Sequence, residues 1–164
     1  MEIGNFYFLN NNYFIDFPDG KLMSNSETVQ AVAHDRPCFY TIYDVTTSLF
    51  WLIPFSSQVS KYRFHYQKKV DRYGICDTIA FGEVLGHEKA FLIQNMCPSI
   101  PRYIKNEYVD NIANIPVRLD GVFEKELIIK AKRVLALHRK GKKLIFPDVL
   151  QIEKDLIREI NNII

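Results

Sequence analysis

The sequence predicts an α+β domain in which a twisted, barrel-like antiparallel sheet is covered by helices near the C-terminus. Short runs of aromatic and β-branched residues, separated by Asn, Asp, Gly and Pro, recur along the first two-thirds of the chain. Such runs are typical of strands joined by turns. From Phe123 onward, apolar residues recur instead at helical spacing. Together these patterns favour a sheet with helices packed on it.

Size and composition are those of one globular domain spanning residues 1–164. Hydrophobic residues make up 48% of the chain, with 12 Phe and 9 Tyr, which excludes a disordered chain. No apolar run is long enough to cross a bilayer, and residues 1–5 do not resemble a secretory signal, so we expect a cytoplasmic protein without membrane contact. Cys38, Cys76 and Cys97 are far apart, so we expect buried thiols and no metal site.

The central prediction is a hairpin. Its strands, Phe39 to Tyr43 and Phe50 to Ile53, are rich in aromatic and β-branched residues, and a polar segment separates them. Arg36 precedes the first strand, and Ser56 and Ser57 follow the second. Because the strands of a hairpin are antiparallel, the arginine and the two hydroxyls come together at one end of the sheet. This end is the candidate site.

The segments before this hairpin have weaker patterns. Phe6 to Leu9 and Tyr13 to Phe17 are aromatic runs divided by three asparagines, which tolerate the backbone of a tight turn, so we expect a hairpin there. Residues 21–33 are polar and predict a loop, or a short helical turn that begins near Ser26.

The segments after it are more regular. Thr78 to Phe81 and Ala90 to Ile93 flank a glycine-containing turn and predict a further hairpin. Phe123 to Arg139 places its apolar residues along one helical stripe, and Gly141 ends that helix. A second amphipathic helix begins after Pro147.

Residues 61–69 alternate basic or polar side chains with aromatic ones. A strand would place the rings on one face and the basic groups on the other. An ordinary half-buried strand has the same pattern, but single-stranded RNA binding also combines bases for the backbone with rings for stacking. We therefore expect RNA contacts from Tyr62, Arg63, His65, Lys68 and Lys69.

Positive charge is concentrated downstream of the candidate site. The net charge is only +2, but residues 61–72 hold five bases against one acid, and residues 130–143 hold seven bases and no acid. This distribution favours a polyanionic partner, for which nucleic acid is the default. From the second block we expect RNA contacts by Arg139, Lys140, Lys142 and Lys143.

The order of these motifs resembles a known family. An Arg-Pro pair before an apolar strand, a second strand ending in Pro-Phe-Ser-Ser, and a lysine shortly after are similar to the type III toxin–antitoxin ribonucleases of the ToxN/AbiQ kind, and within them to the CptN-type toxins. The spacing is also similar to the wider MazF/Kid superfamily. The resemblance implies an SH3-like barrel with added helices and a metal-independent endoribonuclease toxin that needs no cofactor.

It also implies the partners. These are cellular RNA substrates and a small repeat RNA that acts as antitoxin, is processed by the toxin, and bridges protein copies into an assembly. Carried over by position, the family's arginine corresponds to Arg36, its hydroxyl pair to Ser56 and Ser57, and its lysine to Lys61. The usual threonine is a serine here, and a spacer separates the serines from the lysine.

These residue types suit RNA cleavage by the 2′-hydroxyl. That reaction needs a proton donor and acceptor and fixed positive charge for a dianionic transition state. A guanidinium holds two phosphate oxygens at once, which suits Arg36, and Lys61 adds a movable charge. His34 is a further candidate base or acid, since histidine exchanges protons near neutral pH.

Simpler interpretations stand beside this one. Arg36 could pair with a neighbouring aspartate, Ser56 and Ser57 could cap a turn, and His34 could be structural. At the level of the protein, the alternatives are a catalytically inert RNA-binding module of the SH3-like type and a metal-dependent nuclease. The last is disfavoured because the sequence has no acidic Asp-x-Asp cluster for magnesium.

Overall fold

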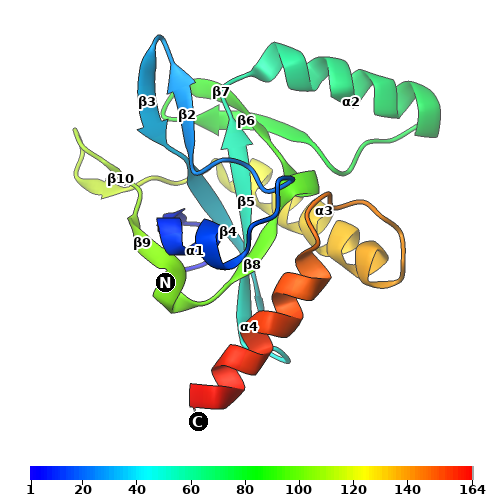
Figure 1. The fold of residues 1–164 in the computed structure, drawn as a ribbon. Coiled ribbons are helices and arrows are strands. Elements are labelled where there is room, and N and C mark those ends of the chain that lie inside the picture. The colour runs from blue at the N-terminus through cyan, green and yellow to red at the C-terminus, as the bar shows by residue number, and fades with distance from the viewer. Residues whose placement is uncertain (164) are drawn as a thin grey trace.

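The computed structural model describes residues 1–163, in which four α-helices surround an antiparallel sheet (Figure 1). This confirms the α+β class. The strands are β1 (Phe6–Leu9), β2 (Ser26–Val29), β3 (Val32–Asp35), β4 (Pro37–Asp44), β5 (Leu49–Ser56), β6 (Ala80–Val84), β7 (His87–Phe91), β8 (Cys97–Ser99), β9 (Ile104–Glu107), β10 (Val109–Asp110) and β11 (Ile115–Pro116). The helices are α1 (Asn11–Asp16), α2 (Val59–Tyr73), α3 (Gly121–Arg139) and α4 (Val149–Ile163), with 3-10 turns η1 (Ile93–Asn95) and η2 (Pro101–Tyr103).

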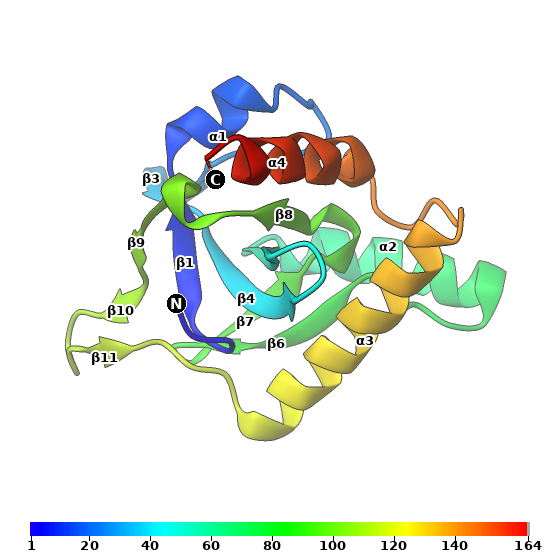
Figure 2. The same ribbon diagram turned by 90° about the horizontal axis from the view of Figure 1, so that it is seen from below.

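The main sheet has seven strands, and β4 and β5 lie at its centre. The strand order is β6-β7-β5-β4-β1-β9, with β8 also paired to β5. β5 pairs with β8 along Phe50–Leu52 and with β7 at Phe55 and Ser56, so its neighbour on this side changes along its length. Figure 2 shows β8 alongside α4, and β6 and β7 on the opposite side of β4. Within residues 1–163 the pairing runs from β6 to β9 and does not close into a barrel.

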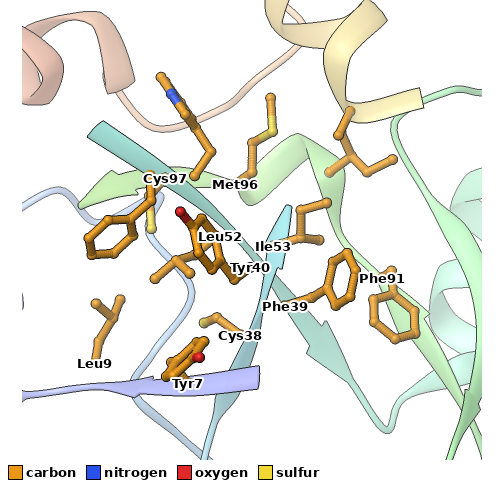
Figure 3. Packing of buried hydrophobic residues seen from close by; sticks show 14 of the residues in the cluster. Tyr7, Leu9, Cys38, Phe39, Tyr40, Leu52, Ile53, Phe91, Met96 and Cys97 are labelled. Carbon is orange, nitrogen blue, oxygen red and sulfur yellow. The ribbon is translucent and has the colours of Figure 1, made fainter. Parts of the chain in front are cut away.

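The predicted central hairpin is confirmed. β4 and β5 pair in register from Cys38 opposite Pro54 to Asp44 opposite Leu49, with an irregularity near Thr41. Leu52 and Ile53 are fully buried, and Figure 3 shows them beside Tyr40, Phe39 and Phe91 in the core between the sheet and α3 and α4. Burying so many large apolar side chains is the main stabilising contribution to the fold. Cys38, Cys76 and Cys97 are buried free thiols, as expected.

The two C-terminal helices are confirmed. α3 begins at Gly121 because the Asp120 carboxylate accepts hydrogen bonds from the backbone N–H groups of Val122 and Phe123, at 3.0 and 3.1 Å. Gly141 follows the helix with a φ of 101°, a left-handed conformation that glycine adopts without strain. α4 begins at Val149, just after Pro147.

β6 lies close against α3 because it contains Gly82. A Cβ atom at this position would overlap the Phe123 ring. Phe123 therefore packs directly over the strand and makes edge contact with Phe91 at 5.3 Å between ring centroids. The β6–β7 hairpin itself was predicted, and its turn has positive φ at Leu85 and Gly86.

Two predictions for the N-terminal part are wrong. The second aromatic run forms the short helix α1 rather than a strand, because Tyr13 and Phe17, four residues apart, are both buried against Tyr103. Residues 21–33, expected to be a loop or helical turn, contain β2 and lead into β3; the two strands form a separate hairpin paired from Ser26 opposite Asp35 to Val29 opposite Val32.

The strand predicted for residues 61–69 is also wrong, since this segment lies in α2. Tyr62, Tyr66 and Val70 share one helical face and pack against a small cluster that includes Ile79 and Leu92. Gly74 ends the helix with a φ of 78°. Of the helices in residues 1–163, none has the length and apolar character to cross a membrane.

Candidate functional site

The candidate site lies where β4 begins and β5 ends, as the hairpin prediction required. Arg36 directly precedes β4, and its Nη1 donates a hydrogen bond to the Phe55 carbonyl oxygen on β5 at 2.6 Å. Ser56 ends β5, and Ser57 precedes α2. The arginine and the two serines therefore meet at one end of the sheet.

Glu27 joins these residues from the β2–β3 hairpin. Its carboxylate accepts hydrogen bonds from Arg36 Nη1 at 3.3 Å, from the Ser57 backbone N–H at 3.2 Å and from Ser57 Oγ at 2.9 Å. The backbone N–H of Arg36 donates to the Asn25 carbonyl, and its Nε to the Ser24 carbonyl. These bonds fasten the hairpin over the end of β5. Glu27 is not among the predicted site residues, because the sequence pattern of residues 21–33 indicates a loop or helical turn and not a hairpin.

Lys89 on β7 completes the cluster, which we call the Ser57 cluster: Glu27, Arg36, Ser57 and Lys89. Lys89 Nζ donates a hydrogen bond to Ser57 Oγ at 2.6 Å. The hydroxyl thus lies between an ammonium and a carboxylate, and such charge-assisted hydrogen bonds are the strong ones. Lys89 is not among the predicted site residues either, because its contact with Ser57 depends on the pairing of β7 with β5.

A groove of about 730 Å³ opens beside this cluster. His34 on β3 and His87 on β7 line it together with Glu27, Ser57 and Lys89, and Figure 1 shows the β2–β3 and β6–β7 hairpins next to each other at one end of the molecule. His87 and Lys89 are two residues apart on one strand, so they share a face, and this spacing could have indicated both in the sequence. The apolar part of the groove's lining includes the aromatic rings of Phe8, Phe55 and Tyr108.

The structure separates the predicted site residues into two groups. His34 and Ser57 line the groove, and Ser57 Oγ lies between Glu27 and Lys89. Ser56 is buried and its Oγ accepts a hydrogen bond from the Gln58 N–H, so it caps the turn before α2. Lys61 is exposed on α2, with its Nζ 5.4 Å from the centre of the Tyr62 ring, and it is not among the residues that line the groove.

Arg36 is only 6% exposed. Its Nε donates to the Ser24 carbonyl, and its Nη1 donates to the Phe55 carbonyl and the Glu27 carboxylate. It pairs with Glu27 rather than with either neighbouring aspartate. A guanidinium buried and bonded in this way fixes the surrounding backbone and the Glu27 carboxylate, and Arg36 is not among the residues that line the groove.

The residues expected to contact RNA on α2 have mixed surroundings. Tyr62 is buried under the helix, and Lys69 is half-buried. Arg63 pairs with Glu88 and lies over the Phe81 ring at 4.3 Å. His65 and Lys68 are exposed, and Lys68 lies over the Phe64 ring at 4.5 Å. The exposed part of α2 thus keeps basic and aromatic groups together, as RNA binding requires, although not in a strand.

The second basic block is divided in the same way. Lys140, Lys142 and Lys143 are exposed beside the end of α3. Arg139 instead pairs with Asp44 at 2.8 Å and with Glu153, and lies over the Trp51 ring. Burial acts to raise the pKa of Asp44, but the hydrogen bond and charge of Arg139, together with backbone hydrogen bonds from Thr46 and Thr47, outweigh it, and the pKa falls below its ordinary value. Arg139 therefore joins α3, α4 and the central hairpin.

Comparison with known proteins adds no assignment. No protein-family model matches the sequence, and no curated protein matches it. Among residues 1–163, no three His, Cys, Asp or Glu side chains are grouped as a metal ion would require. The site is therefore interpreted from its own geometry.

Proposed function

We propose that this chain is a metal-independent endoribonuclease that cleaves single-stranded RNA, acting in the cytoplasm as the toxin of a type III toxin–antitoxin system. The observation that carries the proposal is the position of Ser57 Oγ, 2.6 Å from Lys89 Nζ and 2.9 Å from a Glu27 oxygen at the edge of the groove that His34 and His87 line. The motif order around Arg36 and Ser57 supports the family.

The proposed reaction is internal transesterification. The 2′-oxygen forms a bond to phosphorus while the bond from phosphorus to the 5′-oxygen breaks, so one proton leaves the 2′-hydroxyl and one reaches the departing oxygen. His34 and His87 lie on the walls of one groove and take these two roles. Lys89 supplies positive charge to the phosphate, using an N–H group that Ser57 does not occupy.

The other members of the Ser57 cluster act on these groups indirectly. Glu27 orients Ser57 by accepting hydrogen bonds from the backbone N–H and the hydroxyl of Ser57, and Ser57 in turn orients Lys89. Arg36 holds Glu27 and the end of β5 in place. A preorganised set of this kind stabilises developing charge without reorganising during the reaction. Arg36 is thus a positioning residue in this proposal.

The fold is compatible with the proposed family. A MazF/Kid-like toxin would have an SH3-like barrel, and here a curved, wholly antiparallel sheet with a change of partner along β5 supports that relationship. The partners in the proposal are cellular RNA and a repeat-encoded RNA antitoxin that covers the exposed bases of α2 and of the α3–α4 connection and bridges protein copies.

A second candidate is an RNA-binding module without catalysis. The burial of Arg36 favours it, because the strongest phosphate-binding side chain of the site is already bonded to protein acceptors. Such a module would still use the groove and the exposed bases of α2, but it would not need two histidines in that groove or a lysine bonded to Ser57.

Product analysis tests the proposal. Purified protein is incubated with end-labelled long single-stranded transcripts, with and without EDTA, and the fragment ends are identified. We expect 2′,3′-cyclic phosphate and 5′-hydroxyl ends, no effect of EDTA, and survival of DNA of the same sequence, which lacks the attacking group. An RNA with one 2′-deoxy sugar at the mapped scissile position should bind and resist cleavage.

The alternatives give different results. Cleavage that EDTA abolishes, with 5′-phosphate ends, would assign a metal nuclease. Binding of the transcripts without any cleavage would assign the inert module.

A further inference from the structure

A second cavity, of about 650 Å³, lies beyond the far end of α2. We call it the Lys69 pocket; its lining includes Lys69, Tyr73, Thr78, Lys142, Lys143 and Phe146. Figure 1 shows the end of α2 and the α3–α4 connection on the same side of the molecule. α2 has 15 residues and begins beside Ser57, so a rise of about 1.5 Å per residue separates its ends by about 22 Å. The pocket is therefore distinct from the groove.

Lys69 is an ammonium with neutral partners. Its Nζ donates to Thr78 Oγ1 and to Gln94 Oε1, both at 2.7 Å. An ammonium has three N–H groups, so the third N–H group of Lys69 has no hydrogen-bond acceptor among the residues that the structure describes. Among the same residues, Lys69 forms no ion pair with a carboxylate. Desolvation by burial lowers the pKa of Lys69. An anion in the pocket would offset the cost of burying the charged ammonium by pairing with it.

The remaining charges of the pocket are also mainly positive. Lys142 and Lys143 are exposed on the α3–α4 connection and line the same cavity. Asp77 lines it too, but its carboxylate is 2.9 Å from Arg133 Nη1 and is neutralised by that pair. Three lysines therefore face one cavity without a free carboxylate, which suits a phosphate group.

Aromatic rings stand beside these lysines. Tyr73 is 64% exposed and Phe146 is 47% exposed, although large apolar side chains are usually covered. The Lys69 ammonium lies 5.4 Å from the centre of the Phe146 ring. A flat ring at this position offers a stacking surface for a nucleobase within reach of the lysines.

We propose that the Lys69 pocket is a nucleotide-binding site, in which Lys69, Lys142 and Lys143 hold a phosphate and Tyr73 or Phe146 stacks on the base. The ligand chemistry is that of a nucleoside monophosphate, either free or as one unit of an RNA strand. An acidic peptide would use the lysines but not the rings, so the rings favour the nucleotide. The proposal does not depend on RNA cleavage at the Ser57 cluster.

Binding is measured by isothermal titration calorimetry with AMP, GMP, CMP and UMP in turn, and with inorganic phosphate and hexaglutamate as comparison ligands. We expect at least one nucleotide to bind, with affinity reduced at least about tenfold by Lys69→Met through loss of a charge-assisted hydrogen bond. Tyr73→Ala and Phe146→Ala change exposed rings, and at least one of them should weaken binding several-fold. Lys154→Met, at an exposed lysine of α4 that does not line the pocket, is the matched control and should bind as the unmodified chain does.

Competition identifies the source of the nucleotide. A hexanucleotide of the preferred base is added to Ser57→Ala protein with bound mononucleotide, because this variant removes a residue of the proposed cleavage site. Displacement of the mononucleotide assigns the pocket to RNA. Simultaneous binding of both ligands assigns it to a free nucleotide. Either result supports the site. Nucleotide binding that is absent, or that survives Lys69→Met and both ring variants, would overturn the proposal. So would inorganic phosphate binding as tightly as any nucleotide, or hexaglutamate binding more tightly in a Lys69-dependent way.

If Lys69→Met fails to fold, as judged by its circular dichroism melting curve, the two ring variants decide the outcome alone. Failure of the proposed nuclease function is recognised separately. In that case no RNA is cleaved, while nucleotide binding and its loss in Lys69→Met persist.

Discussion

At the scale of single residues, the site has two candidate lysines, and their positions differ. Lys89 donates a hydrogen bond to Ser57 Oγ, whereas Lys61 is exposed on α2. The sequence pattern indicated Lys61. The geometry favours Lys89, because a charge can stabilise a transition state strongly only where it is held close to the reacting phosphate.

We therefore expect Lys89→Met to lower the rate of RNA cleavage by about 10²–10³-fold, the usual effect of removing one preorganised charge or donor. Lys61→Met is the matched control and should change the rate by less than about tenfold. Single-turnover cleavage of labelled RNA measures both, and thermal melting verifies folding. A larger loss of cleavage rate in Lys61→Met than in Lys89→Met would instead indicate that Lys61 is the lysine that acts in the site.

Arg36 gives the second prediction at this scale. Its side chain is buried and bonded to two carbonyls and a carboxylate. Arg36→Ala removes a donor from the Ser24 and Phe55 carbonyls and removes the charge that pairs with Glu27, so we expect the free energy of unfolding to fall by about 3–5 kcal/mol. Urea denaturation measures the change, and Arg158→Ala, at a side chain that is 72% exposed, is the control. A fully stable but inactive Arg36→Ala protein would instead indicate direct phosphate contact.

At the scale of elements, the α3–α4 connection is organised by His138. Its Nδ1 accepts hydrogen bonds from the backbone N–H groups of Leu144 and Ile145, each at 3.2 Å. Only an imidazole without a proton on Nδ1 can accept them. Desolvation lowers the pKa of His138 below its ordinary value of 6.5, although a hydrogen bond to the Lys142 backbone and the charge of Asp148 act in the opposite direction.

This depression predicts acid sensitivity. Below about pH 6.5 the unfolded chain takes up a proton at His138 that the folded chain does not, so stability is complete above that pH and is lost as the pH falls toward the lowered pKa. Urea midpoints measured from pH 8 to pH 5 should fall more steeply for the natural chain than for His138→Gln. His65→Gln, at an exposed histidine on α2, should keep the natural slope. Parallel curves for all three proteins would contradict the prediction.

At the scale of the whole molecule, exposed bases lie on α2 and on the α3–α4 connection. Cations that neutralise RNA phosphates release counterions, so they make binding depend on salt. Arg139 is held by Asp44 and Glu153 and is expected to contribute little to this dependence.

Replacing Lys140, Lys142 and Lys143 together by Gln should weaken RNA binding and reduce the slope of log affinity against log salt by about 0.7 for each phosphate that is no longer neutralised. Filter binding at several salt concentrations measures the slope. The control replaces Lys105, Lys125 and Lys154, which are exposed elsewhere, and removes the same charge. Equal slopes in the two triple variants would show that the α3–α4 block has no special role in RNA binding.

Errors in the prediction also differ by scale. The alternation of aromatic and basic residues over 61–69 fits a strand, but Tyr62, Tyr66 and Val70 equally fit one face of a helix. The helix forms because that face covers Ile79 and Leu92, which come later in the chain. Likewise, Tyr13 lies in a helix that ends at Asp16, just before Phe17, because Tyr103 packs against both rings.

The sequence alone determined the features that depend on neighbouring residues: the β4–β5 and β6–β7 hairpins, both C-terminal helices and the meeting of Arg36 with Ser57. Each follows from local periodicity and turn chemistry, which short segments carry in full. Only the tertiary structure decided that Glu27 and Lys89 bond to Ser57, since they come from hairpins 30 and 32 residues away in the chain. Contacts between such distant segments are fixed by strand pairing and core packing, to which the whole chain contributes.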